Sequence, residues 1–405
     1  MSPHETADKT RVPTPALDAI ARCLTVICLV SLILGVFRLF DGLDVPFLAY
    51  AVAGAALVHA TQRPAALEIA LTSALAIAFG LIYASMHGRV GAYPGASLVA
   101  VGAFLGLAST VVLGWRACRA NRHMGALLAA TFCPVLLIFT NLGLALAIQL
   151  SPKVFDSYLY RFDAILGPQA SFLAGQLFLR VSFLRILCFH VYSALPLAEV
   201  LALLLYLRGR RMPVNPVVAF ATAGVAGFLL YQICPAAGPI HVFGSAFPFA
   251  PPANVLLEAS PLPGIPRNAI PSLHSAWVIL IWWNVRRCAP AIRWSAAGFA
   301  LLTLLATLGL GEHYLIDLIV AVPFAAAVQA ACAKRWRAAI TGFLLTAGWV
   351  VYLRHGLPMF APGTAVAWAA VVATIGVAAG LMGLEAPSFF ARKRDLGGLA
   401  RLSPQ

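Results

Sequence analysis

Two histidines and one aspartate at the edges of long apolar runs are the residues best suited to chemistry. His274 lies in RNAIPSLHSAW (267–277), where a proline-rich loop meets an apolar run. His313 and Asp317 lie four residues apart in GEHYLIDLIVAVPFA (311–325). On a helix this spacing puts both side chains on one face, within hydrogen-bonding reach. A carboxylate that holds an imidazole fixes its tautomer and raises its basicity, which prepares a histidine to act as base or nucleophile.

The residues around His274 predict the start of a helix. Pro271 suits the first turn, and Ser272 can cap the helix or line its start. His274 would then lie close to free backbone N–H groups and to the positive end of the helix dipole. Such a helix start is a ready place for an anion such as phosphate.

The composition indicates that these residues lie in a membrane protein. The 405 residues are 61% hydrophobic and 10% charged, with a mean hydropathy of +0.89. A soluble protein of this length needs far more charge to cover its surface. The net charge of +14 does not indicate a nucleic-acid partner, because the basic residues cluster in short tracts between apolar runs, as topology signals do. The eight cysteines show no CxxC spacing, which favours apolar packing over disulfides or zinc binding.

The apolar runs predict an all-α fold, a polytopic membrane bundle of about 12 transmembrane helices. A helix needs roughly 20 apolar residues to cross the hydrocarbon layer, and open sheet edges cannot face lipid. The expected spans are 19–40, 46–61, 66–86, 96–115, 126–149, 183–207, 216–234, 272–290, 294–311, 313–333, 338–354 and 363–384. The second of these is short for a span.

The basic residues predict the orientation of the bundle. With the N-terminus inside, 20 of the 28 Lys and Arg residues fall in predicted cytoplasmic segments, so both termini are expected to be cytoplasmic. His274 and His313 are 39 residues apart, with the basic turn 286–293 between them. This separation fits one helix down and one back, each roughly 30 Å long. We therefore expect both histidines on the periplasmic side of a bacterial inner (plasma) membrane.

Two predicted non-cytoplasmic segments are too long to be plain turns. Residues 150–182 mix aromatic and charged residues at helix-like spacing, which predicts helices in the interface or folded over the bundle. Residues 235–271 contain nine prolines and cannot form regular helix. A long ordered loop over one face usually carries function.

PSLHS and GEHYLID resemble the second and third signature motifs of the type 2 phosphatidic acid phosphatase superfamily. YQICPAAGPIHVFG (231–244) and, more weakly, DSYLYRFDAILG (156–167) are similar to its inositolphosphotransferase-like branch, which includes the inositol phosphorylceramide synthases. The resemblance covers roughly residues 130 to 333. It implies a six-helix catalytic core at 126–333, which holds segment 150–182 and loop 235–271. Residues 1–125 would form accessory helices, and residues 334–405 two helices and a basic cytoplasmic tail.

The resemblance also implies roles for the three residues. His313 would be the nucleophile that forms a phosphohistidine, Asp317 would orient it, and His274 would be the general acid and base. No metal and no cofactor is implied. The substrate would be a lipid phosphate or phosphodiester. The second acceptor would be water in a phosphatase of the prenyl or phosphatidic acid type, or a polyol, sugar or lipid alcohol in a phosphotransferase.

The phosphate-binding cations of the family are missing from their usual positions. Arg63-Pro64 is the only Arg-Pro pair and has no matching lysine, and Ala306 and Thr307 occupy the positions of the third motif's Ser-Arg. A phosphate dianion in a partly dry site still needs cationic partners. The candidates for this role and for other contacts to phosphate or head group are Arg267, Lys153, Arg161, Ser272, His241, Tyr231 and Tyr314.

Two other classes of protein remain open. A transporter commonly has twelve spans with both termini inside, although paired halves and broken helices are not evident. A metal hydrolase would use His274, His313, Asp317 and Glu312, although no HExxH-like spacing is present.

Overall fold

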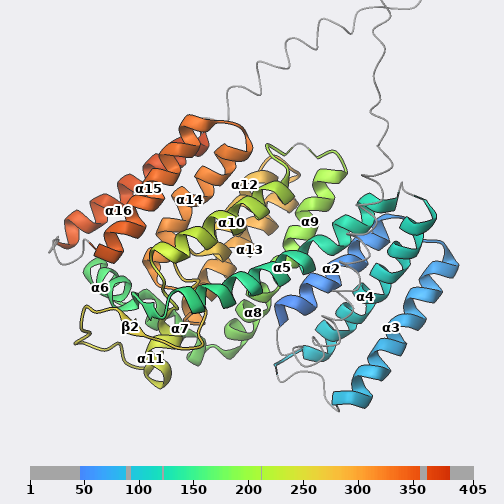
Figure 1. Cartoon of the computed structure of the whole chain (residues 1–405), viewed down its shortest axis with the longest axis horizontal. Helices are drawn as coiled ribbons and strands as arrows, with labels where there is room; N and C mark the ends of the chain where they lie inside the picture. The colour runs from blue at the N-terminus through green and yellow to red at the C-terminus, as the bar shows by residue number, and fades with distance from the viewer. Residues whose placement is uncertain (1–45, 88–92, 121–122, 211, 356–362, 384–405) are drawn as a thin grey trace, which may run out of the picture.

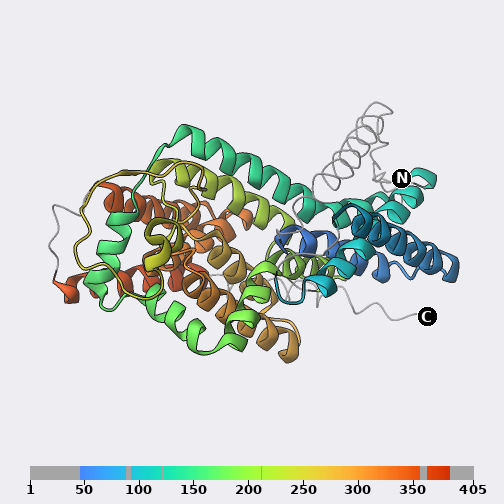
Figure 2. The same cartoon turned by 90° about the horizontal axis from the view of Figure 1, so that it is seen from below.

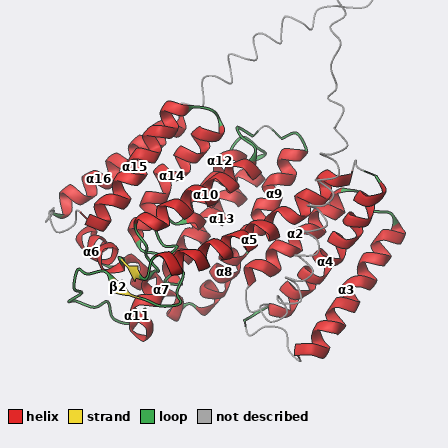
Figure 3. Cartoon of the chain, viewed as in Figure 1, coloured by secondary structure: helices red, strands yellow, loops and turns green. Residues whose placement is uncertain are grey.

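The chain folds as an all-α membrane bundle. The computed structural model describes residues 46–87, 93–120, 123–210, 212–355 and 363–383. This part of the chain contains 15 α-helices and one two-stranded ribbon (Figures 1 and 3).

The helices form three consecutive groups along the chain. The N-terminal group is α2 (Pro46–Thr61), α3 (Ala66–His87) and α4 (Ala96–Arg119). The central bundle is α5 (Met124–Leu150), α8 (Ser182–Ser193), α9 (Leu195–Leu207), α10 (Pro216–Ile233), α12 (Leu273–Val285), α13 (Pro290–Gly309) and α14 (Leu315–Cys332). The C-terminal pair is α15 (Trp336–His355) and α16 (Thr364–Gly383). The outer groups lie on opposite sides of the central bundle, since α2 packs on α5 and α9 whereas α15 and α16 pack on α14 (Figure 1).

The prediction of about 12 transmembrane helices is wrong. Among the described residues, eight helices are long and apolar enough to cross a membrane, or nine if the bent pair α7–α8 is one span. Helices α2, α9 and α12 have only 16, 13 and 13 residues. At 1.5 Å per residue they are about 20–24 Å long, shorter than a hydrocarbon layer of about 30 Å. Apolar composition alone therefore overcounts the spans.

The predicted span 183–207 is interrupted rather than continuous. A turn at Ala194 separates α8 from α9. Helix α8 also meets the preceding α7 (Ala170–Arg180) at 119°. The predicted span 19–40 lies outside the described residues.

The two long connecting segments lie across one end of the bundle (Figures 1 and 2). Segment 150–182 contains strand β1 (Lys153–Val154) and helices α6 (Asp156–Leu166) and α7, so the predicted helical character is confirmed. Loop 235–271 contains the five-residue helix α11 (Pro239–Phe243), the 3₁₀ turn η3 (Gly244–Ala246) and strand β2 (Ser260–Pro261). Strands β1 and β2 pair antiparallel and tie the two segments together. Apart from the short α11 and η3, the rest of the loop contains no helix, as its prolines predict.

The N-terminal group depends on a close approach between two helix backbones. Gly106 of α4 faces Val52 of α2, and a Cβ at Gly106 would lie 1.9 Å from the Val52 carbonyl oxygen. Small residues let helices pack this closely in membranes, where van der Waals contact rather than the hydrophobic effect holds helices together.

Gly106→Ala should lower the stability of the protein by about 1–3 kcal/mol, because the added methyl forces α2 and α4 apart. Thermal unfolding of the detergent-solubilised protein measures the effect. Gly376→Ala is the matched control, since nothing lies within 4 Å of a Cβ at that position in α16. Equal melting temperatures for the two variants would contradict the proposed packing constraint.

Candidate active site

The structure brings the two histidine motifs together at the loop-covered end of the bundle. The ring centroids of His274 and His313 are 6.4 Å apart. Helices α12 and α13 form the hairpin that joins them, so residues 39 positions apart return to one place. The pairing expected from the topology is therefore present in the structure.

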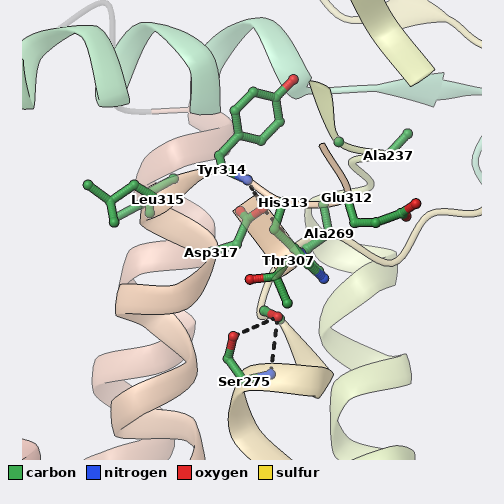
Figure 4. A network of polar contacts seen from close by, with 12 residues as sticks. Ala237, Ala269, Ser275, Thr307, Glu312, His313, Tyr314, Leu315 and Asp317 are labelled. Atoms are coloured by element: carbon green, nitrogen blue, oxygen red, sulfur yellow. Dashed lines mark hydrogen bonds and ion pairs between the residues drawn. The ribbon is translucent and has the colours of Figure 1, made fainter. Parts of the chain in front are cut away.

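One nitrogen of the His313 ring faces two acceptors. Its Nδ1 lies 2.9 Å from the carbonyl oxygen of Ala269 and 3.5 Å from Oδ2 of Asp317 (Figure 4). A carbonyl can only accept, so Nδ1 carries the proton and donates it to Ala269. The other nitrogen, Nε2, is left with a free lone pair, as a nucleophile requires.

The contact between His313 and Asp317 arises differently from the prediction. Helix α14 begins at Leu315, so His313 precedes the helix and does not share a helical face with Asp317. The carboxylate instead turns back over the helix start, where Oδ2 accepts a hydrogen bond of 2.8 Å from the Tyr314 N–H. Capping of α14 therefore puts Asp317 beside His313.

Main-chain hydrogen bonds join the two motifs directly. The N–H of Ser272 donates to the carbonyl of Asp317 at 3.2 Å. Ser272 Oγ accepts hydrogen bonds from the N–H and the hydroxyl of Ser275, at 3.3 and 2.9 Å (Figure 4). Ser272 therefore caps α12, as predicted, and its hydroxyl is already engaged.

His274 lies in the first turn of α12 between aromatic rings. Tyr192 of α8 stacks on it with a centroid distance of 4.0 Å and an interplanar angle of 20°. Phe47 of α2 lies 5.4 Å away on a tilted plane. These rings restrict the imidazole to one orientation.

Two buried aspartates of α6 hold the backbone around the site. Asp156 accepts hydrogen bonds from the N–H groups of Ala237 and Gly238 in the proline-rich loop. Asp163, two turns later, accepts from the first N–H groups of α14, those of Leu315 at 2.7 Å and Ile316 at 3.0 Å. Burial raises the pKa of Asp156 to about 6 and that of Asp163 to about 8, while the N–H bonds oppose the shift. Neither role was predicted, although both residues lie in the stretch 156–167.

Gly238 lets the proline-rich loop touch the segment before His313. Its φ of +102° is in a region that side chains rarely adopt, and a Cβ there would lie 2.3 Å from the carbonyl oxygen of Glu312. The N–H of Ile240 also donates to the Gly311 carbonyl at 2.9 Å. The loop thus packs directly against residues 311–312, which precede His313.

The three cations predicted to bind phosphate do not line the cavity beside His274. Arg267 is fully buried and donates to the carbonyls of Ser151 at 3.0 Å and Pro152 at 3.3 Å, and also to those of Ile265 and Leu262. Burial lowers its pKa. Lys153 and Arg161 are exposed. A phosphate-binding role remains a prediction for these three residues, and for Arg267 it would require breaking the hydrogen bonds that its guanidinium donates to main-chain carbonyls.

A cavity of about 220 Å³ opens beside His274. Its polar lining comprises Thr140, Asn141, Tyr192, Glu199, Tyr231, Asn268, His274 and Glu312. Its apolar lining comprises Phe47, Leu48, Cys133, Leu136, Leu137, Leu144, Leu195, Pro196, Leu273 and Trp277. No lysine or arginine of the described chain lines it.

The two tyrosines predicted to contact phosphate or head group lie in different surroundings. Tyr231 lines the cavity. Tyr314 is fully buried and its hydroxyl points toward α6, away from the His313 ring (Figure 4). Only Tyr231 is placed where a molecule in the cavity would meet it.

His241 pairs with the acid next to His313. Its Nε2 lies 3.5 Å from Oε2 of Glu312, and both side chains are about 30% exposed. The hydrogen bond to Glu312 raises the pKa of His241. His241 therefore contacts the cavity lining through Glu312.

Residues 157–331 match a family model described as PAP2 superfamily. The matched region contains both histidines, Asp317 and the cavity's polar residues from α9, α10 and the loop. Residues 157–331 thus form a PAP2 superfamily domain in a polytopic membrane bundle, and the superfamily indicated by the two motifs is confirmed for this region. Comparison with curated proteins and with solved structures gave no match. Within the described residues no group of three or more His, Cys, Asp or Glu side chains is arranged to hold a metal ion.

Glu312→Gln should lower the pKa of His241, because the carboxylate stabilises the protonated imidazole. The ion pair contributes to stability below the ordinary histidine pKa and is lost as pH rises through the raised value. Titration of His241 by NMR in detergent measures the shift. An unchanged pKa in Glu312→Gln would show that the contact is absent in solution.

Proposed function

We propose that the protein is a membrane phosphatase or phosphotransferase that acts on a lipid phosphate or phosphodiester through a phosphohistidine. The observation that carries this proposal is the geometry at His313. Its Nδ1 is held by Ala269 and Asp317, and the second histidine ring lies 6.4 Å away. This leaves the lone pair of Nε2 free to act as the nucleophile, with His274 as the neighbouring acid and base.

In the first step, Nε2 of His313 attacks phosphorus and the phosphorus–oxygen bond to the leaving alcohol breaks. His274 in its protonated form gives its proton to the departing oxygen. The acceptors at Nδ1 stabilise the positive charge that develops on the His313 ring. Covalent transfer splits one difficult displacement into two easier ones.

In the second step, neutral His274 removes the proton from water or from an acceptor alcohol. The resulting oxygen nucleophile attacks phosphorus, the phosphorus–nitrogen bond breaks and His313 is regenerated. Water gives a phosphatase, and an alcohol gives a phosphotransferase. Because the same groups serve both outcomes, access of the acceptor decides between them.

Main-chain N–H groups would form part of the binding site for the phosphate. The first N–H groups of α12 are close to His274 and, with the helix dipole, favour an anion. Protonated His241 adds a positive charge next to Glu312. The remaining candidates for attracting the phosphate, without direct contact, are Arg267, Lys153 and Arg161.

Transfer of a phosphorylated polyol head group is the outcome that we favour. It rests on the resemblance of 231–244 to the inositolphosphotransferase-like branch. The reaction would take place at the periplasmic side of a bacterial inner membrane with both termini cytoplasmic, because the basic turn 286–293 lies at the opposite end of the α12–α13 hairpin from the histidines. The catalytic core would be 126–333, flanked by accessory helices.

His313→Ala should abolish both turnover and the phosphoenzyme, because it removes the imidazole nitrogen that we propose takes the phosphoryl group. Purified protein is incubated with ³²P-labelled lipid phosphates and phosphodiesters, with and without acceptor alcohols. Acid-labile label on wild type but not on the variant supports the assignment, and released phosphate or new lipid distinguishes the two outcomes. Wild-type turnover by a folded His313→Ala variant would refute the assignment.

His274→Ala should slow the reaction by about 10²–10⁴-fold for substrates with alkyl leaving groups, since general acid catalysis contributes on that scale. The loss should be much smaller for a nitrophenyl ester, whose leaving group needs no proton. Initial rates for the two ester types measure this difference. An equal loss for both would assign His274 another role.

A further inference from the structure

The first turn of α2 lies against His274, although α2 is outside the region that matches the PAP2 family model. That region is 157–331, whereas α2 ends at Thr61. The ring centroids of Phe47 and His274 are 5.4 Å apart, and those of Phe47 and Tyr192 are 5.2 Å apart at an interplanar angle of 74°. The N-terminal group of helices therefore contributes a side chain to the site.

The imidazole of His274 is held by ring packing. Among the described residues no hydrogen bond to its ring is present, whereas Nδ1 of His313 donates to a main-chain carbonyl. Tyr192 stacks on the imidazole, and Phe47 packs on both of these rings. The ring of Trp277 lies further away, at 6.3 Å. Because aromatic rings at such distances and angles attract one another, the orientation of His274 depends on Tyr192 and Phe47 together.

Helix α2 also holds α8, the helix that carries Tyr192. A hydrogen bond of 3.0 Å joins the Tyr50 hydroxyl to Nδ1 of His190, which lies two residues before Tyr192. Tyr50 follows Phe47 by three residues, so both side chains project from one face of α2. One face of α2 thus supplies the first ring that packs on His274 and holds the helix that supplies the second.

Helix α2 is itself fixed by close packing on two sides. A Cβ at Gly54 would lie 2.8 Å from Cγ2 of Val200 in α9. On the side of α4, a Cβ at Gly106 would lie 1.9 Å from the carbonyl oxygen of Val52. Contacts this close leave α2 little freedom to shift or rotate. The first turn of α2 therefore has a fixed place at the site.

We infer that the N-terminal group completes the active site and that Phe47 is a positioning residue for His274. The inference rests on the proposed mechanism, in which His274 protonates the leaving alcohol and later deprotonates the acceptor. Both proton transfers require the imidazole to lie within hydrogen-bonding reach of the reacting oxygen. Phe47, together with Tyr192, keeps the ring in that orientation, and the matched region alone does not contain this contact.

Phe47→Ala should slow cleavage of a lipid phosphate with an alkyl leaving group about 10–100-fold, because misplacing a catalytic group by about 1 Å costs on that scale. The leaving group of p-nitrophenyl phosphate needs no proton, so the first turnover of this ester should change by less than about twofold. Phe47→Tyr retains the ring and should restore most of the rate. Single-turnover rates of the purified variants measure these effects.

A double-mutant cycle with His274→Ala separates positioning from general damage. In the His274→Ala background, Phe47→Ala should cause no further loss, because the group that Phe47 positions is gone. The same fold loss in both backgrounds, or an equal loss for the alkyl and nitrophenyl esters, would overturn the inference. A wild-type rate of Phe47→Ala on the alkyl ester would overturn it as well.

Phe104→Ala is the matched control, because this ring of α4 packs on Tyr83 at 5.7 Å and does not line the cavity beside His274. It should leave both single-turnover rates unchanged. A loss as large as that of Phe47→Ala would overturn the inference, since any lost ring in the N-terminal group would then have the same effect.

Phe47→Leu provides the same comparison if the alanine variant does not fold, because leucine fills much of the volume without a ring. It should show the same selective loss on the alkyl ester, and no selective loss would overturn the inference. Absence of a phosphoenzyme in wild type would overturn the proposed mechanism, and this inference with it. A phosphoenzyme in wild type together with unaffected Phe47 variants would overturn the inference alone.

Discussion

The hydrogen bond from the His313 ring to the Ala269 carbonyl is the interaction on which the site depends. It joins residues 44 positions apart and links the loop before α12 to the segment before α14. Because a carbonyl cannot donate, this bond fixes the tautomer of the ring without any contribution from Asp317. The aspartate, at 3.5 Å, then adds charge rather than geometry. A neutral carbonyl thus orients the ring of the proposed nucleophile, and Asp317 lies where it would support the charge that develops on that ring.

Contacts of segments 150–182 and 235–271 hold Ala269 and His313 in place relative to each other. Asp156 holds residues 237–238 and Asp163 holds the start of α14, so one face of α6 fixes both sides of the site. The N–H of Ala269 itself donates to the Ala236 carbonyl. The bonds to Asp156 and to Ala236 satisfy main-chain groups of the proline-rich loop, whereas those to Asp163 satisfy the first N–H groups of α14. The cost of burying two carboxylates is thereby spread over four main-chain donors.

The sequence was sufficient to predict what depends on composition and local pattern. The apolar runs predicted helices along most of the described chain. The 39-residue separation predicted that His274 and His313 lie at the same end of the bundle, where the structure has them. Span number was overestimated because hydropathy does not register helix length, as α12 with 13 residues shows. Ala269 and Asp163 were missed for a different reason. Their roles use main-chain groups from distant segments, and no residue type or spacing marks such contacts.

Arg267 shows how a charge near a site can act without touching it. Its guanidinium donates hydrogen bonds to carbonyls next to β1 and β2. Arg267 itself lies two residues before Ala269, whose carbonyl orients His313. Several donors in a fixed fork can hold several turns of irregular backbone at once, which a lysine could not do. The loop carries nine prolines and so has few N–H groups of its own to donate. Arg267 supplies the missing donors, and so helps to hold the backbone that carries the Ala269 carbonyl against His313.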